Sequence, residues 1–298
     1  MAHNQLDILA DLKVHRLPSL PHVLVDMLQA CQGNKVSFQE LSSIISRDAA
    51  IASRVVLLAN SSFYNTGTKI TSLEKALFLL GIDTLKSIVI TASIQQFFSA
   101  FKSAQSKFLI AFWQRSLTTA LLAKSLAILT SYPNPDEVYL TGLLHNIGEL
   151  VLDSNHPGLY HDKTNSLKNS LSDEEKLALE QNTFAFNHAH VGACLAKEWG
   201  LSQFICDAIE FHHADKTLIE DAHHLVKLIY LASFLSHSDK KHLDLNDDIA
   251  HQLFELNTAL VNEIVNKIEI EVTDISKSLG LDLKTTQDNL KKNQEQAQ

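Results

Sequence analysis

The sequence contains few of the residues that interrupt helices. Among 298 residues there are only 9 glycines and 5 prolines, and most of them lie between segments whose apolar residues recur every three or four positions. The strand pattern, apolar and polar residues in alternation with many β-branched side chains, is hard to find. We therefore predict an all-α protein, and its 45% hydrophobic content can supply a proper core.

Excess positive charge and long apolar runs are also missing. The chain has 25 Lys and Arg against 34 Asp and Glu, a net charge of −9, which argues against general binding to nucleic acid or to an anionic membrane, although a local basic patch stays open. No window offers the ~20 consecutive apolar residues of a membrane span. The first residues lack the basic head and apolar run of a signal peptide. We expect a cytoplasmic protein without a membrane partner.

Cysteine is scarce. Cys31, Cys194 and Cys206 are widely separated and form no C-x-x-C pair, so we expect reduced thiols that lie mostly in the core. Cys194 and Cys206 are near the histidine-rich region, which leaves a thiolate ligand open as an alternative. Histidine, by contrast, is abundant: there are 15, and their grouping indicates where to look for a site.

Helix signals divide the chain into three parts. Capping boxes, in which a Ser or Thr is followed three residues later by Glu, are expected at Ser37–Glu40, Thr71–Glu74 and Ser172–Glu175. Asn187 and Ser202 are expected to cap two later helices. Periodicity predicts an N-terminal helical subdomain over 1–105, a second helical subdomain over 106–240, and a C-terminal helical extension with a polar tail over 241–298.

A polar pair, His145 and Asn146, interrupts the apolar stretch "TGLLHNIGELVLDS" at Thr141–Ser154. The apolar residues around the pair recur at helical spacing, so we expect one helix with a buried face. A buried imidazole and a buried amide need partners. Metal ions, substrate oxygens and other polar side chains are all open as those partners.

Several short motifs follow one another, each on its own expected helix. They are "WQRS" with Arg115, "HNIG" with His145 and Asn146, "NHAHVG" with His188, and the pair His212 and His213. Their order resembles the HD superfamily of metal-dependent phosphohydrolases. The resemblance implies a divalent ion held by imidazoles and carboxylates, which lowers the pKa of a bound water near a phosphoryl group.

The N-terminal half resembles one family of that superfamily, the HDOD family. The motifs that carry this likeness are "LPSLP" at Leu17–Pro21, "ISRDAAIASRVVLLANSSFY" at Ile45–Tyr64 and "KITSLEKALFLLGIDTLKSIVI" at Lys69–Ile90. The resemblance covers about Leu17 to His237. It implies an all-helical bacterial signalling or regulatory module, often connected to response-regulator or cyclic-dinucleotide circuits and usually without demonstrated catalysis.

Four positions depart from the pattern of metal-binding relatives. The resemblance places Asn146 and Ser233 where those relatives have Asp, Arg115 where they usually have His, and Glu149 where active relatives often have Lys. An amide or a hydroxyl brings no negative charge, and a guanidinium cannot coordinate a cation. We therefore expect no catalytic residue and no cofactor.

Imidazoles remain, however, and they leave two alternatives open. His145, His188, His212 and His213 could together hold iron, manganese or zinc. The pair could instead belong to a polar core in which Arg115 donates to Asn146, to backbone carbonyls or to Glu149, and a guanidinium there would also suit a small anionic ligand.

These observations predict a non-catalytic regulatory HDOD module that acts through protein–protein or small-ligand binding. The alternative is a metal-dependent phosphohydrolase acting on a nucleotide or phosphoester. The partner that we expect is a signalling protein, namely a kinase, a response regulator or a cyclic-dinucleotide enzyme. Phe97, Phe98 and Phe101 are core residues by default, with a docking face as the alternative. The predicted pocket comprises Arg115, His145, Asn146, Glu149, His188, His212, His213 and Ser233.

Overall fold

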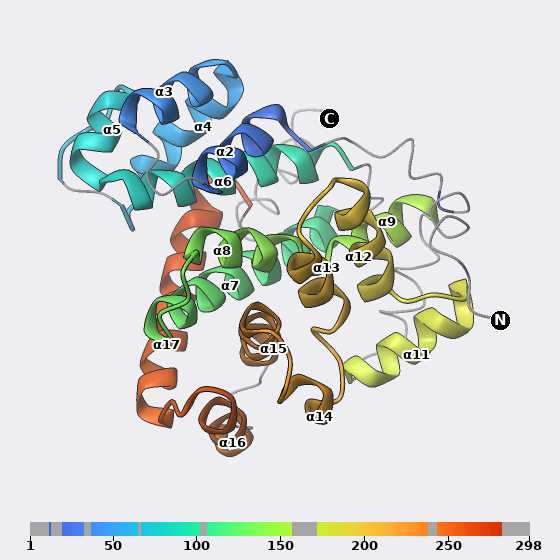
Figure 1. Ribbon diagram of the computed structural model, residues 1–298. Helices are drawn as coiled ribbons and strands as arrows, with labels where there is room; N and C mark the ends of the chain where they lie inside the picture. The colour runs from blue at the N-terminus through green and yellow to red at the C-terminus, as the bar shows by residue number, and fades with distance from the viewer. Residues whose placement is uncertain are drawn as a thin grey trace, which may run out of the picture. The chain divides into compact units, whose positions relative to one another are not determined.

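The computed structural model describes residue 12 and residues 20–32, 37–64, 67–101, 106–156, 172–237 and 243–281. Within these ranges every regular element is a helix (Figure 1), which confirms the all-α prediction. None of the described helices is long and apolar enough to cross a membrane. The predicted polar end of the C-terminal tail lies outside the described residues.

The chain groups into two compact units, and each is described by itself. The histidine unit comprises Met1–Ser19 and Ala100–Val265, and the second unit comprises Leu20–Ser99 and Asn266–Gln298. Both units therefore combine segments that are far apart in the sequence. The three-part division predicted from helix signals stays a prediction.

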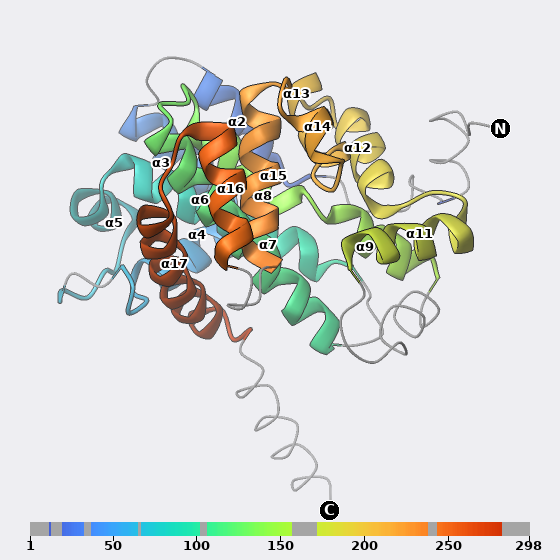
Figure 2. The same cartoon turned by 90° about the horizontal axis from the view of Figure 1, so that it is seen from below.

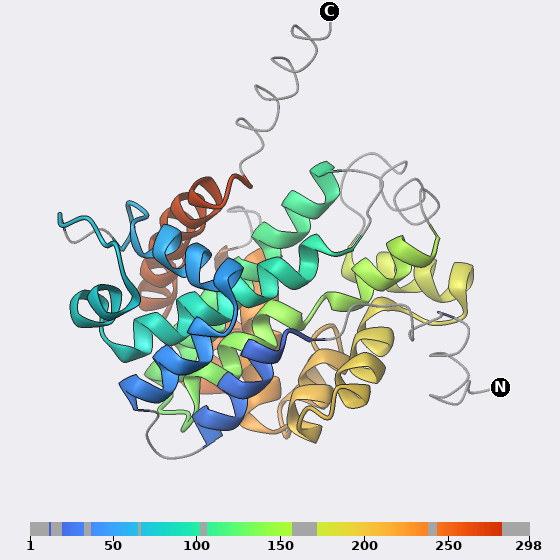
Figure 3. The same cartoon turned by 90° about the horizontal axis from the view of Figure 1, so that it is seen from above.

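The second unit is built around α6, which packs against α2 and α4. Phe97 and Phe98 of α6 are 2% and 5% exposed, so they are core residues rather than a docking face. Figure 3 shows these N-terminal helices in blue to cyan. The helices of the unit are α2 (His22–Gln32), α3 (Phe38–Ser46), α4 (Ala49–Ala59), α5 (Leu73–Leu80) and α6 (Ile82–Ser99).

The histidine unit is a bundle in which α7 packs against α8 and α15, while α12 packs against α9 and α13 (Figures 1 and 2). Phe101, near the start of the segment Ala100–Val265, is also buried. A further helix, α17 (Thr258–Ser278), is divided between the two units at Val265. The helices of the unit are α7 (Ser106–Leu129), α8 (Pro135–Leu144), α9 (Ile147–Asn155), α11 (Asp173–Phe184), α12 (His188–Glu198), α13 (Gln203–Glu210), α14 (Lys216–Ile219), α15 (His224–His237) and α16 (Leu243–Phe254).

Side-chain caps begin the helices that carry the candidate site. Ser172 and Glu175 form a complete capping box at the start of α11, and the Asn187 and Ser202 side chains accept backbone N–H groups at the starts of α12 and α13. These three predictions are confirmed. The box predicted at Thr71 is wrong by one residue, because Ser72 is the residue that caps α5.

The stretch Thr141–Ser154 is not the single helix that its periodicity predicts. α8 ends at Leu144 and α9 begins at Ile147, so the His145–Asn146 pair forms the turn between them. The His145 Nδ1 atom lies 2.7 Å from the Gly142 carbonyl oxygen. In a continuous helix that oxygen would accept the N–H of Asn146, so the imidazole competes for the bond that would continue the helix.

Two glycines let neighbouring helices approach closely. A Cβ on Gly148 would lie 1.9 Å from the carbonyl oxygen of His188, and one on Gly142 would lie 2.5 Å from the Cα of Ala120. Neither distance leaves room for a methyl group in a close-packed interior. Gly148 thereby brings the beginning of α9 against the beginning of α12, so the His145 turn and His188 become neighbours.

Candidate functional site

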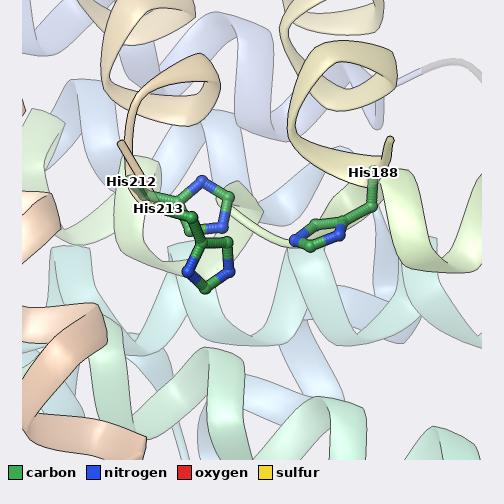
Figure 4. A group of neighbouring side chains, drawn as sticks. All are labelled: His188, His212 and His213. Carbon is green, nitrogen blue, oxygen red and sulfur yellow. The ribbon is translucent and has the colours of Figure 1, made fainter. Parts of the chain in front are cut away.

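Imidazoles from two helix ends converge in the histidine unit. His188 begins α12, whereas His212 and His213 follow the end of α13. The ligand atoms of these three side chains lie within 4.8 Å of one another, and Figure 4 shows the three rings around a common space. The ring centroids are 4.0 Å apart for His212 and His213 and 5.2 Å apart for His188 and His213.

The polar turn reaches this group through His212. The ring centroids of His145 and His212 are 5.0 Å apart, and the Asn146 Oδ1 atom is 3.0 Å from His212 Nε2. His145 and Asn146 are fully buried. The structure therefore brings all four predicted imidazoles close together, although the group within 4.8 Å contains three of them and not His145.

All four rings have their Nδ1 atom next to an oxygen. Histidines that bind metals usually donate one ring N–H in this way, which fixes the ring and leaves the other nitrogen for the cation. The Nε2 atom of His188 has no hydrogen-bond partner among the described residues. The Nδ1 distances are 2.7 Å from His145 to Gly142 O, 2.7 Å from His188 to Glu180 Oε2, 2.6 Å from His212 to Ile209 O and 3.2 Å from His213 to Asp173 Oδ2.

The contacts of His212 are of a kind that a bound cation would stabilise. Burial, followed by the nearby His213 and His145 imidazoles, holds the pKa of His212 well below its usual value. The ring is therefore neutral, and the short contact with the Ile209 carbonyl takes its one N–H. Its Nε2 lone pair then faces an amide oxygen of Asn146, and two acceptors at 3.0 Å repel each other unless a cation binds them or the amide rotates to donate.

A buried carboxylate close to the imidazoles is already neutralised. The Glu149 Oε2 atom is 2.7 Å from the Arg115 guanidinium, and its Oε1 atom is 2.5 Å from the Lys176 ammonium. Burial alone raises the pKa of Glu149, but the two cations outweigh burial and hold that pKa well below its usual value. Glu149 is one of the partners predicted for Arg115, and the structure places the two side chains in contact.

The sequence predicted the start of α11 but not its role as the helix that supports the imidazoles. Its Asp173, Lys176 and Glu180 contact His213, Glu149 and His188 respectively. Burial raises the pKa of Glu180, yet the contact with His188 leaves that pKa below its usual value. The three charged residues are three, four and seven positions apart, a spacing that places them on one face of a helix following the capping box. The residues that they contact lie on other helices or at their ends, so the sequence alone did not reveal these contacts.

The remaining candidates lie outside the three-imidazole group. Ser233 is fully buried on α15, where its carbonyl accepts from Ser236 Oγ at 2.7 Å. Cys194 and Cys206 are buried free thiols and do not belong to the group. The side chain of Cys31 lies outside the described residues.

A family model of the HDOD domain matches residues 17–215, which is more than half of the chain. The chain belongs to the HDOD family. This membership confirms the resemblance inferred from the motifs. An uncharacterized protein of Treponema pallidum (strain Nichols) is 23% identical over 205 residues, and the match covers 67% of this HDOD chain but only 38% of that protein.

Solved structures share the HDOD fold. An HDOD domain protein with unknown function from Geobacter sulfurreducens has a TM-score of 0.75 at 23% identity, covering 94% of this chain and 100% of that one. A candidate phosphohydrolase from Shewanella amazonensis SB2B has a TM-score of 0.71 at 22% identity, covering 91% and 98%. A candidate signal transduction protein from Marinobacter aquaeolei VT8 has a TM-score of 0.67 at 20% identity, covering 94% and 62%.

Proposed function

We propose that this HDOD chain is a non-catalytic regulatory module whose histidine centre binds a divalent cation without hydrolysing a phosphoester. The observation that carries the proposal is the composition of the centre. Its converging imidazoles have an uncharged Asn146 beside them, and the buried Glu149 carboxylate is held by Arg115 and Lys176. Three imidazoles suit zinc or ferrous iron better than manganese or magnesium, which prefer oxygen ligands.

The two cationic side chains argue against turnover. The carboxylates of HD-type relatives bring negative charge to the metal, whereas Arg115 brings a positive charge that it keeps at every pH at which the protein is folded. Each positive charge in the surroundings also lowers the affinity of the centre for a cation. A centre of this kind suits a role in binding, where occupancy is the signal, better than a role in repeated catalysis.

The first experiment measures metal content and hydrolysis on the same preparation. We expect the chain, loaded with zinc or with iron(II) under anaerobic conditions, to hold about one ion. We expect no turnover of p-nitrophenyl phosphate, its bis ester, nucleotides or cyclic dinucleotides. His212→Ala should lose the ion, while His251→Ala, which removes an exposed histidine, should retain it. Turnover that His212→Ala abolishes would contradict the non-catalytic proposal.

A metal-dependent phosphohydrolase is the second candidate, and the number of ligands favours it. Catalytic zinc sites commonly use three protein ligands and leave one position open. A cation there would polarise a phosphoryl oxygen and make hydroxide available near neutral pH. The Arg115 side chain, 32% exposed, could pair with an anionic substrate.

Restoring the residue types of active relatives tests why the parent centre would lack turnover. The triple variant Arg115→His, Asn146→Asp and Ser233→Asp returns the residue types of active relatives, whereas Asn146→Asp alone leaves Arg115 and Ser233 unchanged. We expect no hydrolysis from the single variant. A metal-loaded, hydrolysing Asn146→Asp protein would contradict this interpretation of the site, because Arg115 and Ser233 would then not prevent turnover.

The regulatory role also needs a partner. We propose a cytoplasmic signalling protein, such as a kinase, a response regulator or a cyclic-dinucleotide enzyme, and the description of the Marinobacter neighbour as a candidate signal transduction protein supports this. A small anion paired with Arg115 is a further candidate ligand. Nucleic acid is not proposed, because the net charge of −9 opposes it.

A further inference from the structure

α11 presents one charged face to the histidine centre. Asp173, Lys176 and Glu180 follow one another at intervals of three and four residues, so they share a face of the helix. Their three side chains contact His213, Glu149 and His188 respectively. Glu174, by contrast, is exposed.

This face supplies charge that the rest of the centre lacks. Glu180 Oε2 accepts from both the backbone N–H and the ring of His188, each at 2.7 Å. A carboxylate on Nδ1 makes an imidazole a stronger ligand and offsets the charge of a bound cation. Lys176 has the opposite effect, because its ammonium repels a cation and neutralises Glu149.

The attachment of α11 rests largely on these polar contacts. Glu180 is the single fully buried residue of the helix, and no apolar side chain of α11 is fully buried. Phe184, at the last position, stacks on His156 with ring centroids 4.9 Å apart. A helix without a fully buried apolar side chain is held by less packing than one such as α13, so its docking can respond to a change in charge.

We infer that α11 carries the positioning residues of the centre: Asp173 and Glu180 strengthen cation binding through His213 and His188, Lys176 weakens it, and a bound cation secures α11 in return. The two effects are thermodynamically linked: if docking of α11 raises the affinity for the cation, then a bound cation must stabilise the docked position of α11 by the same free energy. This inference rests on the proposed role of the centre as a cation-binding site. It adds that cation binding would stabilise the docking of α11.

Three single variants test the inference with two measurements. Zinc affinity is determined by competition with a chelator, and hydrogen exchange is followed in the amides of α11 with and without zinc. Glu180→Gln should weaken zinc binding about 10- to 100-fold, whereas Lys176→Gln should strengthen it. Glu174→Gln removes a carboxylate from the exposed face of the same helix and should change neither measurement. Zinc should slow the exchange of α11 in the parent chain and in Glu174→Gln.

The opposite signs distinguish positioning from simple damage to the fold. If Glu180→Gln and Lys176→Gln both weaken zinc binding, or if zinc leaves the exchange of α11 unchanged in the parent chain, the inference is wrong. Absence of zinc binding by the parent chain would also overturn it. Phosphoester turnover would instead overturn the proposed function and leave the comparison of the variants intact.

Discussion

Gly148 sets how closely His188 approaches the His145 turn, because a Cβ at this position would lie 1.9 Å from the His188 carbonyl oxygen. Gly148→Ala should therefore force the backbones of α9 and α12 apart. We expect a loss of about 3 kcal/mol in the free energy of unfolding, at the upper end of the usual cost of overpacking. Urea unfolding monitored by tryptophan emission measures this loss, and zinc affinity should fall with it.

Gly192→Ala is the matched control. It makes the same change in α12, but the Cβ would meet the Ile209 side chain at 3.0 Å rather than a backbone atom. A side-chain methyl group can shift by a few tenths of an ångström, so the cost should be smaller. Equal losses for the two variants would show that the approach at His188 is not the critical contact.

Residue types in the sequence identified much of the centre but not its supports. The order of the motifs singled out His145, His188, His212 and His213, which the structure brings together. The oxygens that orient their rings were not predictable in the same way. Two are backbone carbonyls, which a sequence does not distinguish, and two are carboxylates on α11, a helix whose partners are distant in the chain.

The division between α8 and α9 shows what periodicity leaves out. Leu144, Ile147 and Leu150 are all buried, as a single amphipathic helix requires. A two-residue turn preserves that burial, so the hydrophobic pattern does not reveal it. The deciding interaction is local and polar, because the His145 ring takes the Gly142 carbonyl.

The capping box of α11 offers a prediction for a whole element. Ser172→Ala removes the hydroxyl that accepts the N–H of Glu175, at a cost of about 1 kcal/mol. Because no apolar side chain of α11 is fully buried, we expect this change to speed hydrogen exchange along most of the helix. Zinc affinity should fall as well.

Ser202→Ala provides the comparison, since Ser202 caps α13 in the same way. α13 buries Ile205, Cys206, Ala208 and Ile209, so packing should keep its amides protected after the cap is lost. If both helices respond equally, α11 is held more firmly than its contacts indicate.

The two compact units lead to a prediction for the whole molecule. Both tryptophans, Trp113 and Trp199, lie in the histidine unit, whereas circular dichroism reports helices of both units. Zinc at 100 times its dissociation constant should stabilise the unit that binds it by about 2.7 kcal/mol. We expect the tryptophan transition in urea to move with zinc while part of the dichroism transition stays in place. Coincident transitions that move together would show that the units unfold as one.

At this scale the sequence predicted the class of fold, whereas the pairing of distant segments lies beyond its local signals. Scarce glycine and proline and clear helical periodicity led to the all-α prediction, which local signals can support. The two units, however, each join distant segments, for example Leu20–Ser99 with Asn266–Gln298. Such pairing depends on contacts between surfaces that no local pattern records.

The turn between α8 and α9 contacts a residue far along the chain, which has a consequence for the order of events during synthesis. Asn146 and His212 meet across 66 positions of the chain, so the three imidazoles and the turn cannot assemble until all of that length has left the ribosome and its loop has closed. Individual helices can form earlier, each with its own cap. A chain that ends before His212 therefore lacks two of the three imidazoles on which the proposed cation site depends.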